Sequence, residues 1–344
     1  MGENESANQF KNLRQRDDYF CSMQKFLGEL KTRAENSRRS EFIKIGNKES
    51  LRRRYIDMLG YPLNSYKKDP DVNVKAEPFA ESKDEKISMT RYQLEVMPGF
   101  WFYGILYEHK KRKKSTKNAF VIAQHGGGGT PELVGSLVFD SANYNHMVKR
   151  VINEETTVFA PQLLLWDPGN FGSGGYDRIE TDKKLKQFGG SMTGLEVYCI
   201  MRCIDYFAGL DDIDENRIGM IGLSYGGMYT VYAAAADTRI KVALSSCWFN
   251  DRLKHNWFDW AYFNQANLFF DAEVSSLVLP RKLYVEIGQN DELFDPADAE
   301  ADIGRLLEYA KNENCEDCLR IKVFEGLHEL DKSDDGIRFF VANL

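Results

Sequence analysis

Residues 218–236 constrain the fold of this chain more than any other segment. They form a short apolar run, then Gly222-Leu223-Ser224-Tyr225-Gly226, then an alanine-rich stretch that favours a helix. A serine on a sharp turn between a strand and a helix has this pattern. Gly222 and Gly226 lack side chains where strand and helix must approach, so Ser224 can adopt a strained, exposed conformation near a helix N-terminus. We therefore predict that Ser224 is a nucleophile.

An acid and a histidine follow this serine, each just beyond a predicted strand. Asp291 follows the strand expected at 283–287, and His328 follows the strand expected at 319–324. Serine is a poor nucleophile at neutral pH, so an imidazole must accept its proton and a carboxylate must orient that imidazole. Ser, acid, His is the chain order of the α/β-hydrolase triad. The predicted triad is Ser224, Asp291 and His328, and this chemistry needs no metal or organic cofactor.

Other residues compete for the acid and base roles. Asp295 precedes Pro296 and is better suited to be the N-cap of the next helix. Asp251 follows the strand before an aromatic segment, a position that some hydrolases use for the acid, and it stays an alternative. His255 lies inside that aromatic segment, where we expect it to line a pocket or to pack.

A glycine loop supplies the expected oxyanion hole. The apolar run at 120–124 ends in His125 and four consecutive glycines. Glycines let a backbone N–H approach a carbonyl oxygen closely, and the N–H of Tyr225 would be the second donor. Gly127 and Gly128 are the candidates for the loop donor, and the sequence does not choose between them. His125 is expected to hold the loop by hydrogen bonds or to border the pocket.

These motifs together resemble the α/β-hydrolase superfamily, and most closely its bacterial dienelactone-hydrolase-like and acetyl-xylan-esterase-like esterases. The resemblance covers nearly the whole chain. It is carried by the glycine loop at 125–129, the approach to the nucleophile strand at 202–219, the Gly-x-x-Asp at 288–291 and the Gly-x-His at 326–328. It implies hydrolysis of esters, often short acyl esters on sugars.

The order of apolar runs predicts an α/β fold. Residues 91–96 and 100–107 read as an antiparallel hairpin, and later strands alternate with helices, which is typical of parallel β-α-β units. We expect the α/β-hydrolase fold: a mainly parallel twisted sheet with an antiparallel N-terminal edge and helices on both faces. Residues 1–68 are expected to be an N-terminal helical extension, and 69–344 the catalytic domain. Apolar residues at helical spacing in the extension would dock it on that domain: Phe20, Met23, Phe26, Leu27 and Leu30. A role of the extension in oligomerisation or in covering the site is the alternative.

Two segments are expected to shape the pocket. Trp166 opens a glycine-rich loop, and residues 247–276 form a cap-like aromatic segment before the acid strand. Aromatic faces suit a sugar ring or an acyl group, although such clusters also serve as core. The candidate pocket residues from the aromatic segment are Trp248, His255, Trp257 and Trp260.

Charge and cysteine usage exclude several classes of protein. A net charge of −7 argues against nucleic-acid or anionic-membrane binding as the main role. The polar first thirty residues lack the apolar core of a signal peptide, so we expect a cytoplasmic location. Cys315 and Cys318 form a lone C-x-x-C with no second pair, which favours incidental thiols over a zinc site. A homo-oligomer is compatible with this sequence.

The sequence therefore predicts a serine ester hydrolase that works through an acyl-enzyme on a small-molecule ester. By resemblance alone, the substrate is a short-chain, acetyl-type ester of a carbohydrate or small alcohol. The alternatives are a peptidase or thioesterase with the same triad, and a non-catalytic hydrolase-fold binding protein. The complete triad weighs against the last, because a binding module does not need one.

Overall fold

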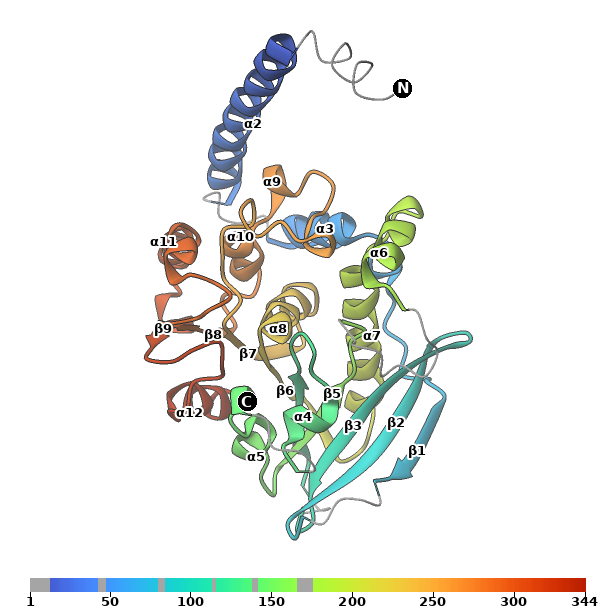
Figure 1. Cartoon of the computed structure of the whole chain (residues 1–344). Helices are drawn as coiled ribbons and strands as arrows, with labels where there is room; N and C mark the ends of the chain where they lie inside the picture. Colours follow the sequence, from blue (N-terminus) through green and yellow to red (C-terminus); the bar gives the residue numbers. More distant parts are fainter. Residues whose placement is uncertain (1–12, 43–47, 80–83, 113–115, 138–141, 166–175) are drawn as a thin grey trace, which may run out of the picture.

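The computed structural model of this chain describes residues 13–42, 48–79, 84–112, 116–137, 142–165 and 176–344. Nine strands form one sheet in the order β1-β2-β3-β5-β4-β6-β7-β8-β9 (Figure 1). The strands are β1 (Val74–Pro78), β2 (Ile87–Met97), β3 (Phe100–His109), β4 (Asn118–Gln124), β5 (Thr156–Pro161), β6 (Ile213–Leu223), β7 (Ile240–Ser246), β8 (Lys282–Gly288) and β9 (Leu319–Phe324).

The sheet has the predicted division into an antiparallel edge and a parallel centre. Strand β2 pairs with β1 and β3 in antiparallel fashion, and β3 pairs with β5 in the same way. All pairings from β5 through β4 to β9 are parallel. Every residue of β4 is buried, as expected for a central parallel strand covered on both faces. The prediction of an α/β-hydrolase fold is confirmed.

Helices cover both faces of this sheet. The described helices are α2 (Leu13–Phe42), α3 (Lys48–Leu59), α4 (Pro131–Gly135), α5 (Met147–Val151), α6 (Arg178–Gln187), α7 (Met192–Ala208), α8 (Tyr225–Ala236), α9 (Gln265–Leu268), α10 (Asp271–Ser276), α11 (Pro296–Asn312) and α12 (Asp335–Ala342). One core contains buried side chains of α3, α7, α8, α10 and α11, and the second contains those of α4, α5 and α12. Short 3₁₀ turns lie at Leu63–Ser65, Ala142–Tyr144 (η2), Phe258–Trp260 (η3) and Glu316–Cys318.

The first two described helices differ in how they meet the body. Helix α3 packs on α8, and its Tyr55 is fully buried and donates a hydrogen bond to the Tyr232 carbonyl at 3.1 Å. Helix α2 contacts the body only through its C-terminal part, and the rest extends away from it (Figure 1). The expectation that Phe20, Met23, Phe26, Leu27 and Leu30 dock on the catalytic domain is therefore wrong, because all five are exposed. No described helix is long and apolar enough to cross a bilayer.

Two arginines satisfy the C-terminal carbonyls of α8, the helix that begins directly after Ser224. The last carbonyls of a helix have no partner within it. Arg52 from α3 donates to the Ala235 carbonyl and, at 3.2 Å, to the Leu277 carbonyl. Arg281 donates to the Ala234 carbonyl at 2.7 Å. Because α8 is buried throughout, water cannot replace these donors easily.

We expect Arg52→Leu to lower the free energy of unfolding by about 2–3 kcal/mol, since the buried Ala235 carbonyl loses its side-chain donor, whereas the Leu277 carbonyl keeps Arg281. Urea unfolding followed by circular dichroism measures the change. Arg53→Leu is the matched control: Arg53 lies on the same helix but is exposed, so its loss should cost under about 0.5 kcal/mol. Equal losses in the two variants would contradict this role for Arg52.

Candidate active site

The predicted serine, acid and histidine all follow parallel strands, so they lie at one edge of the sheet. Ser224 comes directly after β6, Asp291 lies three residues after β8, and His328 lies four residues after β9. The carboxyl ends of neighbouring parallel strands share an edge, which is where open α/β sheets bind ligands. All three residues are mostly buried, with 8–9% of each exposed.

Ser224 has the strained backbone that the sequence predicts. Its φ of 61° and ψ of −124° lie in a region that side-chain-bearing residues rarely adopt. The strain is imposed by close packing on either side of the serine. A Cβ at Gly222 would lie 2.2 Å from the Gly226 carbonyl oxygen, and a Cβ at Gly226 would lie 2.1 Å from the Gln124 carbonyl oxygen. Only glycine fits at these two positions, so β4, β6 and α8 meet closely enough to hold Ser224 on its turn.

His328 is oriented by Asp291. Its Nδ1 lies 2.9 Å and 3.0 Å from the two carboxylate oxygens of Asp291. The backbone amides of Leu293 and Phe294 donate to the same carboxylate at 2.8 Å and 3.0 Å. Burial opposes ionisation of Asp291, but these hydrogen bonds outweigh it, and the pKa of Asp291 lies below its usual value. The carboxylate is therefore ionised at neutral pH and directs the other ring nitrogen, Nε2, away from itself.

Ser246, at the end of β7, connects the serine turn to the histidine loop. Its carbonyl accepts the Ser224 N–H at 2.8 Å, and its hydroxyl donates to the Glu329 carbonyl at 3.1 Å. Glu329 is the residue next to His328 in the chain. The turn that carries Ser224 and the loop that carries His328 are thus joined by one buried residue.

The glycine loop after β4 lies against Ser224. A Cβ at Gly126 would come within 2.9 Å of the Ser224 Cβ. The Gly126 N–H donates to the Tyr144 hydroxyl at 2.8 Å, and the Gly129 N–H donates to the Gly126 carbonyl at 3.0 Å. Neither Gly127 nor Gly128 donates its amide to another described residue, and both are exposed. The amides of Gly126 and Gly129 are thus occupied, and Gly127 and Gly128 both stay candidates for the oxyanion donor.

His125 hydrogen bonds to this loop and is fully buried. Its Nδ1 lies 2.8 Å from the Gly126 carbonyl, and its Nε2 accepts the Leu163 N–H at 2.9 Å. Burial lowers the pKa of His125 to about 4, so the ring is neutral at physiological pH. The hypothesis that His125 borders the pocket is therefore corrected: it fixes the loop conformation.

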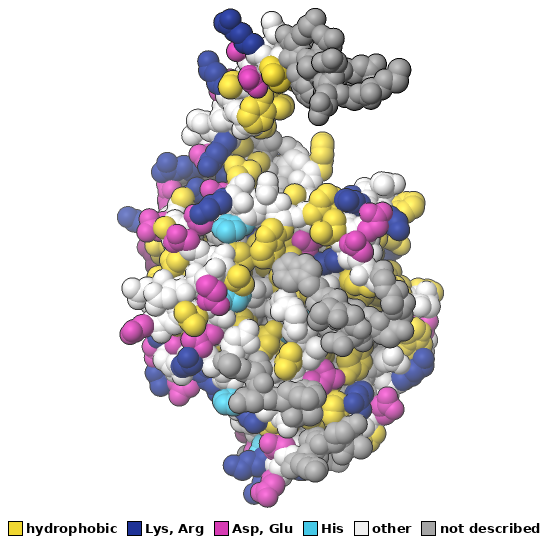
Figure 2. All heavy atoms as spheres, in the orientation of Figure 1, with side chains coloured by type: hydrophobic (Ala, Val, Ile, Leu, Met, Phe, Trp, Pro, Cys, Tyr) yellow, Lys and Arg dark blue, Asp and Glu magenta, His cyan; other side chains and the backbone are white. Residues whose placement is uncertain are grey.

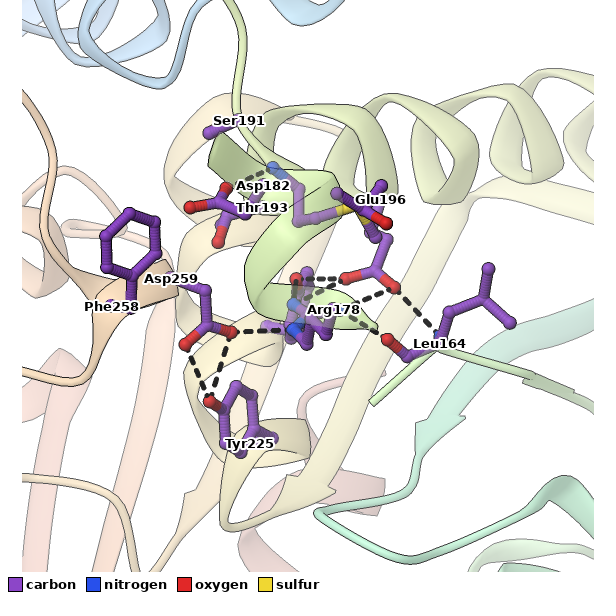
Figure 3. Close-up of polar contacts among 12 residues, drawn as sticks. Leu164, Arg178, Asp182, Ser191, Thr193, Glu196, Tyr225, Phe258 and Asp259 are labelled. Atoms are coloured by element: carbon purple, nitrogen blue, oxygen red, sulfur yellow. Dashed lines mark hydrogen bonds and ion pairs between the residues drawn. The ribbon is translucent and has the colours of Figure 1, made fainter. Parts of the chain in front are cut away.

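A buried polar cluster surrounds Tyr225, the residue after the nucleophile. Arg178, the first residue of α6, contacts Asp259 of η3 at 2.6 Å and Glu196 of α7 at 3.0 Å (Figure 3). The Tyr225 hydroxyl lies 3.0 Å and 3.1 Å from the Asp259 oxygens. Tyr229 hydrogen bonds both Arg178 and Glu196. Burial and the Asp259 carboxylate raise the pKa of Tyr225, so its hydroxyl stays protonated and can donate.

This cluster joins four separate segments at the start of α8. Burial by itself would lower the pKa of Arg178, but Glu196, Tyr229 and Asp259 more than offset it, and the pKa is raised. A buried charge is tolerated only when it is paired and hydrogen bonded in this way. The side chain of Tyr225 is therefore anchored through Asp259 to the segment that covers α8, while its backbone N–H lies at the proposed oxyanion position.

The predicted pocket residues differ in how deeply they are buried. Trp248 and Trp260 are 1% and 2% exposed, so both are core side chains, which corrects their assignment to the pocket wall. Trp257 is half-buried and stacks on Tyr225 with ring centroids 5.7 Å apart. His255 contacts Asp298 at 3.1 Å and packs on Phe294, which in turn packs on the His328 ring. Trp166 lies outside the described residues.

The two competing acids have structural roles. Asp295 caps α11 by accepting the Ala297 N–H at 3.0 Å, as predicted. Asp251 accepts the Leu253 N–H at 2.8 Å in the turn after β7. Neither carboxylate accepts a hydrogen bond from His328, which is bound by Asp291.

Several residues near the site carry no sequence signal that would reveal them. Arg178, Glu196 and Asp259 are charged residues in ordinary helical or loop contexts, and only folding brings them together. Cys247 is buried, and its Sγ lies within 4.8 Å of potential ligand atoms of Asp291 and His328. Among the described residues, these three side chains could together approach a metal ion. Burial raises the pKa of Cys247 to about 12, so the thiol stays protonated at neutral pH.

Known proteins resemble this chain in sequence and in fold. Residues 189–273, which include the serine turn, match the prolyl oligopeptidase family. The Bacillus subtilis (strain 168) protein named "Putative hydrolase YtaP" is 29% identical over 226 residues, which cover 62% of this chain and 74% of that protein.

Two solved esterases show the similarity in fold. A glucuronoyl esterase from Solibacter usitatus superposes with a TM-score of 0.62 at 14% identity, covering 87% of this chain and 92% of that chain. An acetyl xylan esterase from Paenibacillus sp. R4 superposes with a TM-score of 0.59 at 14% identity, covering 88% and 95%. At these identities, the similarity to the two esterases concerns the fold. The sheet order, the strained serine turn and these matches agree: this chain has the α/β-hydrolase fold and is a serine hydrolase.

Proposed function

We propose that the protein is a carboxylic ester hydrolase with Ser224 as nucleophile, His328 as general base and Asp291 as the group that orients the base. One observation carries the proposal: the strained Ser224 turn and the His328–Asp291 pair lie at the same edge of the sheet, and Ser246 hydrogen bonds both the Ser224 amide and the Glu329 carbonyl next to His328. A turn strained in this way has a cost of order 1–3 kcal/mol, and such strain clusters at catalytic sites.

In the proposed reaction, the Ser224 oxygen attacks the ester carbonyl carbon while its proton passes to His328 Nε2. The carbonyl oxygen becomes an oxyanion, which the N–H groups of Tyr225 and of Gly127 or Gly128 stabilise. Collapse of this intermediate breaks the bond to the alcohol, which leaves with the proton from His328. Water then attacks the acyl-serine with His328 again as base, and this releases the acid and restores Ser224.

The residues beside the dyad support a small acyl group and a ring-bearing or small alcohol. Trp257 is half-buried, and its ring lies 5.7 Å from the ring of Phe294, a core side chain that packs 5.6 Å from the His328 ring. Leu293 and Leu327, which flank the acid and the histidine in the chain, are 51% and 56% exposed. Aromatic faces with few polar groups suit sugar rings and acyl chains. The acetyl xylan esterase with this fold supports an acetyl-type ester of a carbohydrate, which is our proposed substrate class.

We expect fast hydrolysis of p-nitrophenyl acetate, slower hydrolysis of the butyrate and octanoate, and release of acetate from peracetylated xylose. In Ser224→Ala these activities should fall by about 10⁴-fold or more, because the nucleophile is gone. Circular dichroism would check that the variant folds. A peptide p-nitroanilide series tests the peptidase alternative that the family match raises. Faster cleavage of the amides, or no ester turnover by the folded protein, would contradict the esterase proposal.

We expect Asp291→Asn to lower kcat by about 10³–10⁴-fold with little change in KM, because the neutral amide no longer favours the productive tautomer of His328. Asp295→Asn is the matched control four residues away, since asparagine caps helices as well as aspartate does. Steady-state kinetics on p-nitrophenyl acetate compares the two. A large loss in the control, with none in Asp291→Asn, would transfer the acid role to Asp295.

We expect Tyr225→Phe to lower kcat by about 10-fold with KM nearly unchanged, because the oxyanion amide loses its side-chain anchor at Asp259. Tyr229→Phe removes a buried hydroxyl from the same cluster one turn further along α8, where no oxyanion donor is proposed. It should destabilise the protein similarly and leave kcat within about 2-fold of the wild type. If both variants lowered kcat equally, the cluster would act on stability rather than on the oxyanion amide.

A further inference from the structure

Helix α2 exposes most of its length. Only its C-terminal part is tied to the body: Ala34, Arg38 and Phe42 are buried, and Arg38 pairs with Glu273 at 3.2 Å. Residues 13–33 are all exposed, and this part of the helix extends away from the rest of the molecule (Figure 1). Figure 2 shows hydrophobic side chains among charged ones on this projecting helix.

The exposed part carries an apolar stripe with the spacing of a coiled coil. Phe20, Met23, Leu27 and Leu30 follow one another at intervals of three, four and three residues, and they are 55%, 40%, 49% and 40% exposed. This alternation keeps apolar side chains on one seam of a helix, which a second helix can cover. Ala34 continues the same seam into the body, where it is buried. Tyr19 and Phe26, at 72% and 52% exposed, flank the stripe on one side.

An isolated helix with such a stripe lacks the packing that stabilises most helices in water. The stripe, its two flanking aromatic residues and Leu13 together expose roughly 700 Å² of apolar side-chain surface, if each fully exposed side chain offers on the order of 200 Å². That is close to the roughly 800 Å² per partner that a specific protein–protein interface buries. It also exceeds the few hundred Å² of contiguous apolar surface that monomers ordinarily expose.

We propose that the N-terminal part of α2 pairs with α2 of a second copy of this chain, antiparallel, to form a homodimer. A two-fold axis that crosses the helix pair at the level of Lys25 places Phe20 against the second copy's Leu30 and Met23 against the second copy's Leu27. Symmetry repeats both contacts, so all four stripe residues are covered. The proposal does not depend on the hydrolase chemistry, because α2 contributes no residue to the candidate active site.

The charged residues beside the stripe favour the antiparallel arrangement. The antiparallel arrangement brings Asp17 next to the second copy's Lys31, and it places Phe26 next to Phe26 of the second copy. The Lys31 Nζ lies 3.8 Å from a carboxylate oxygen of Asp251 in its own chain, and the two side chains are 47% and 36% exposed. Such an exposed ion pair is weak, so Lys31 can pair with Asp17 of the second copy instead. A parallel pair would instead set Arg16, which lies on the seam, against the same arginine of the other copy. Like charges facing each other on a seam are unfavourable.

A membrane surface is the rival partner for an apolar helical stripe, and the charges disfavour it. Helices that bind anionic bilayers carry mainly Lys and Arg on their polar face. In residues 13–33, Asp17, Asp18 and Glu29 interrupt the basic side chains, and the whole chain has a net charge of −7. Mixed charges suit the flanks of a helix pair, where opposite signs face each other.

Sedimentation equilibrium of the full chain tests the proposal. We expect a dimer at about 10 µM protein, and Leu27→Glu should weaken dimerisation by about 100-fold or more. Ser22→Glu is the matched control: Ser22 lies on the exposed face away from the stripe, so its variant should stay dimeric. Unchanged ester hydrolysis and circular dichroism would show that both variants fold. A monomeric wild type, or equal weakening in both variants, would overturn the proposal.

A disulfide test checks the orientation. In a Cys21→Ser background, Phe26→Cys should form a covalent dimer on mild oxidation, because residue 26 lies near the proposed axis. Ser22→Cys should not, since it lies on the outer face of the pair.

Flotation with phosphatidylserine vesicles tests the membrane rival. Cross-linking of the Ser22→Cys variant at the same rate, or vesicle binding by a monomeric wild type, would overturn the antiparallel dimer.

Discussion

The close approach of β4, β6 and α8 is the constraint on which the site depends. Gly222 and Gly226 leave no space for a Cβ, so the chain must turn sharply at Ser224. The strain of that turn persists because α8 is buried along its whole length and its C-terminal carbonyls are satisfied by Arg52 and Arg281. The conformation of Ser224 is thus stabilised by close packing beside the turn and by hydrogen bonds at the far end of α8.

A second level of organisation connects the aromatic segment to this turn. Asp259 in η3 accepts the Tyr225 hydroxyl and is itself paired with Arg178. The segment between β7 and β8 therefore covers α8 and also restrains the residue that follows the nucleophile. Such a buried pair contributes little net stability by itself, but removal of one member leaves an unpaired charge in the interior. The cluster consequently specifies one arrangement of these segments.

The strands and the acid–histidine pair could be predicted because their signals are local. Fully buried parallel strands appear as continuous apolar runs, and β8 and β9 lie within one residue of where those runs predicted them. Strand β6 begins earlier than its apolar run, at Ile213, because its first residue pairs with Asn118 although the next four are polar or charged. Whether Trp248 and Trp257 lie in the core or at the pocket could not be predicted, since core and pocket aromatics have the same sequence pattern.

The sequence by itself determined the division of the sheet into an antiparallel edge and a parallel part, the serine turn and the order of the candidate triad, because glycine positions, apolar runs and chain order are properties of neighbouring residues. Only the tertiary structure decided what lies around them. It joined Arg178, Glu196 and Asp259 across three segments, buried His125 next to the glycine loop, and left the stripe of α2 exposed, with no cover from the described residues of its own chain. Burial and pairing depend on residues distant in the chain, and helical periodicity shows that a face is apolar but not what covers it.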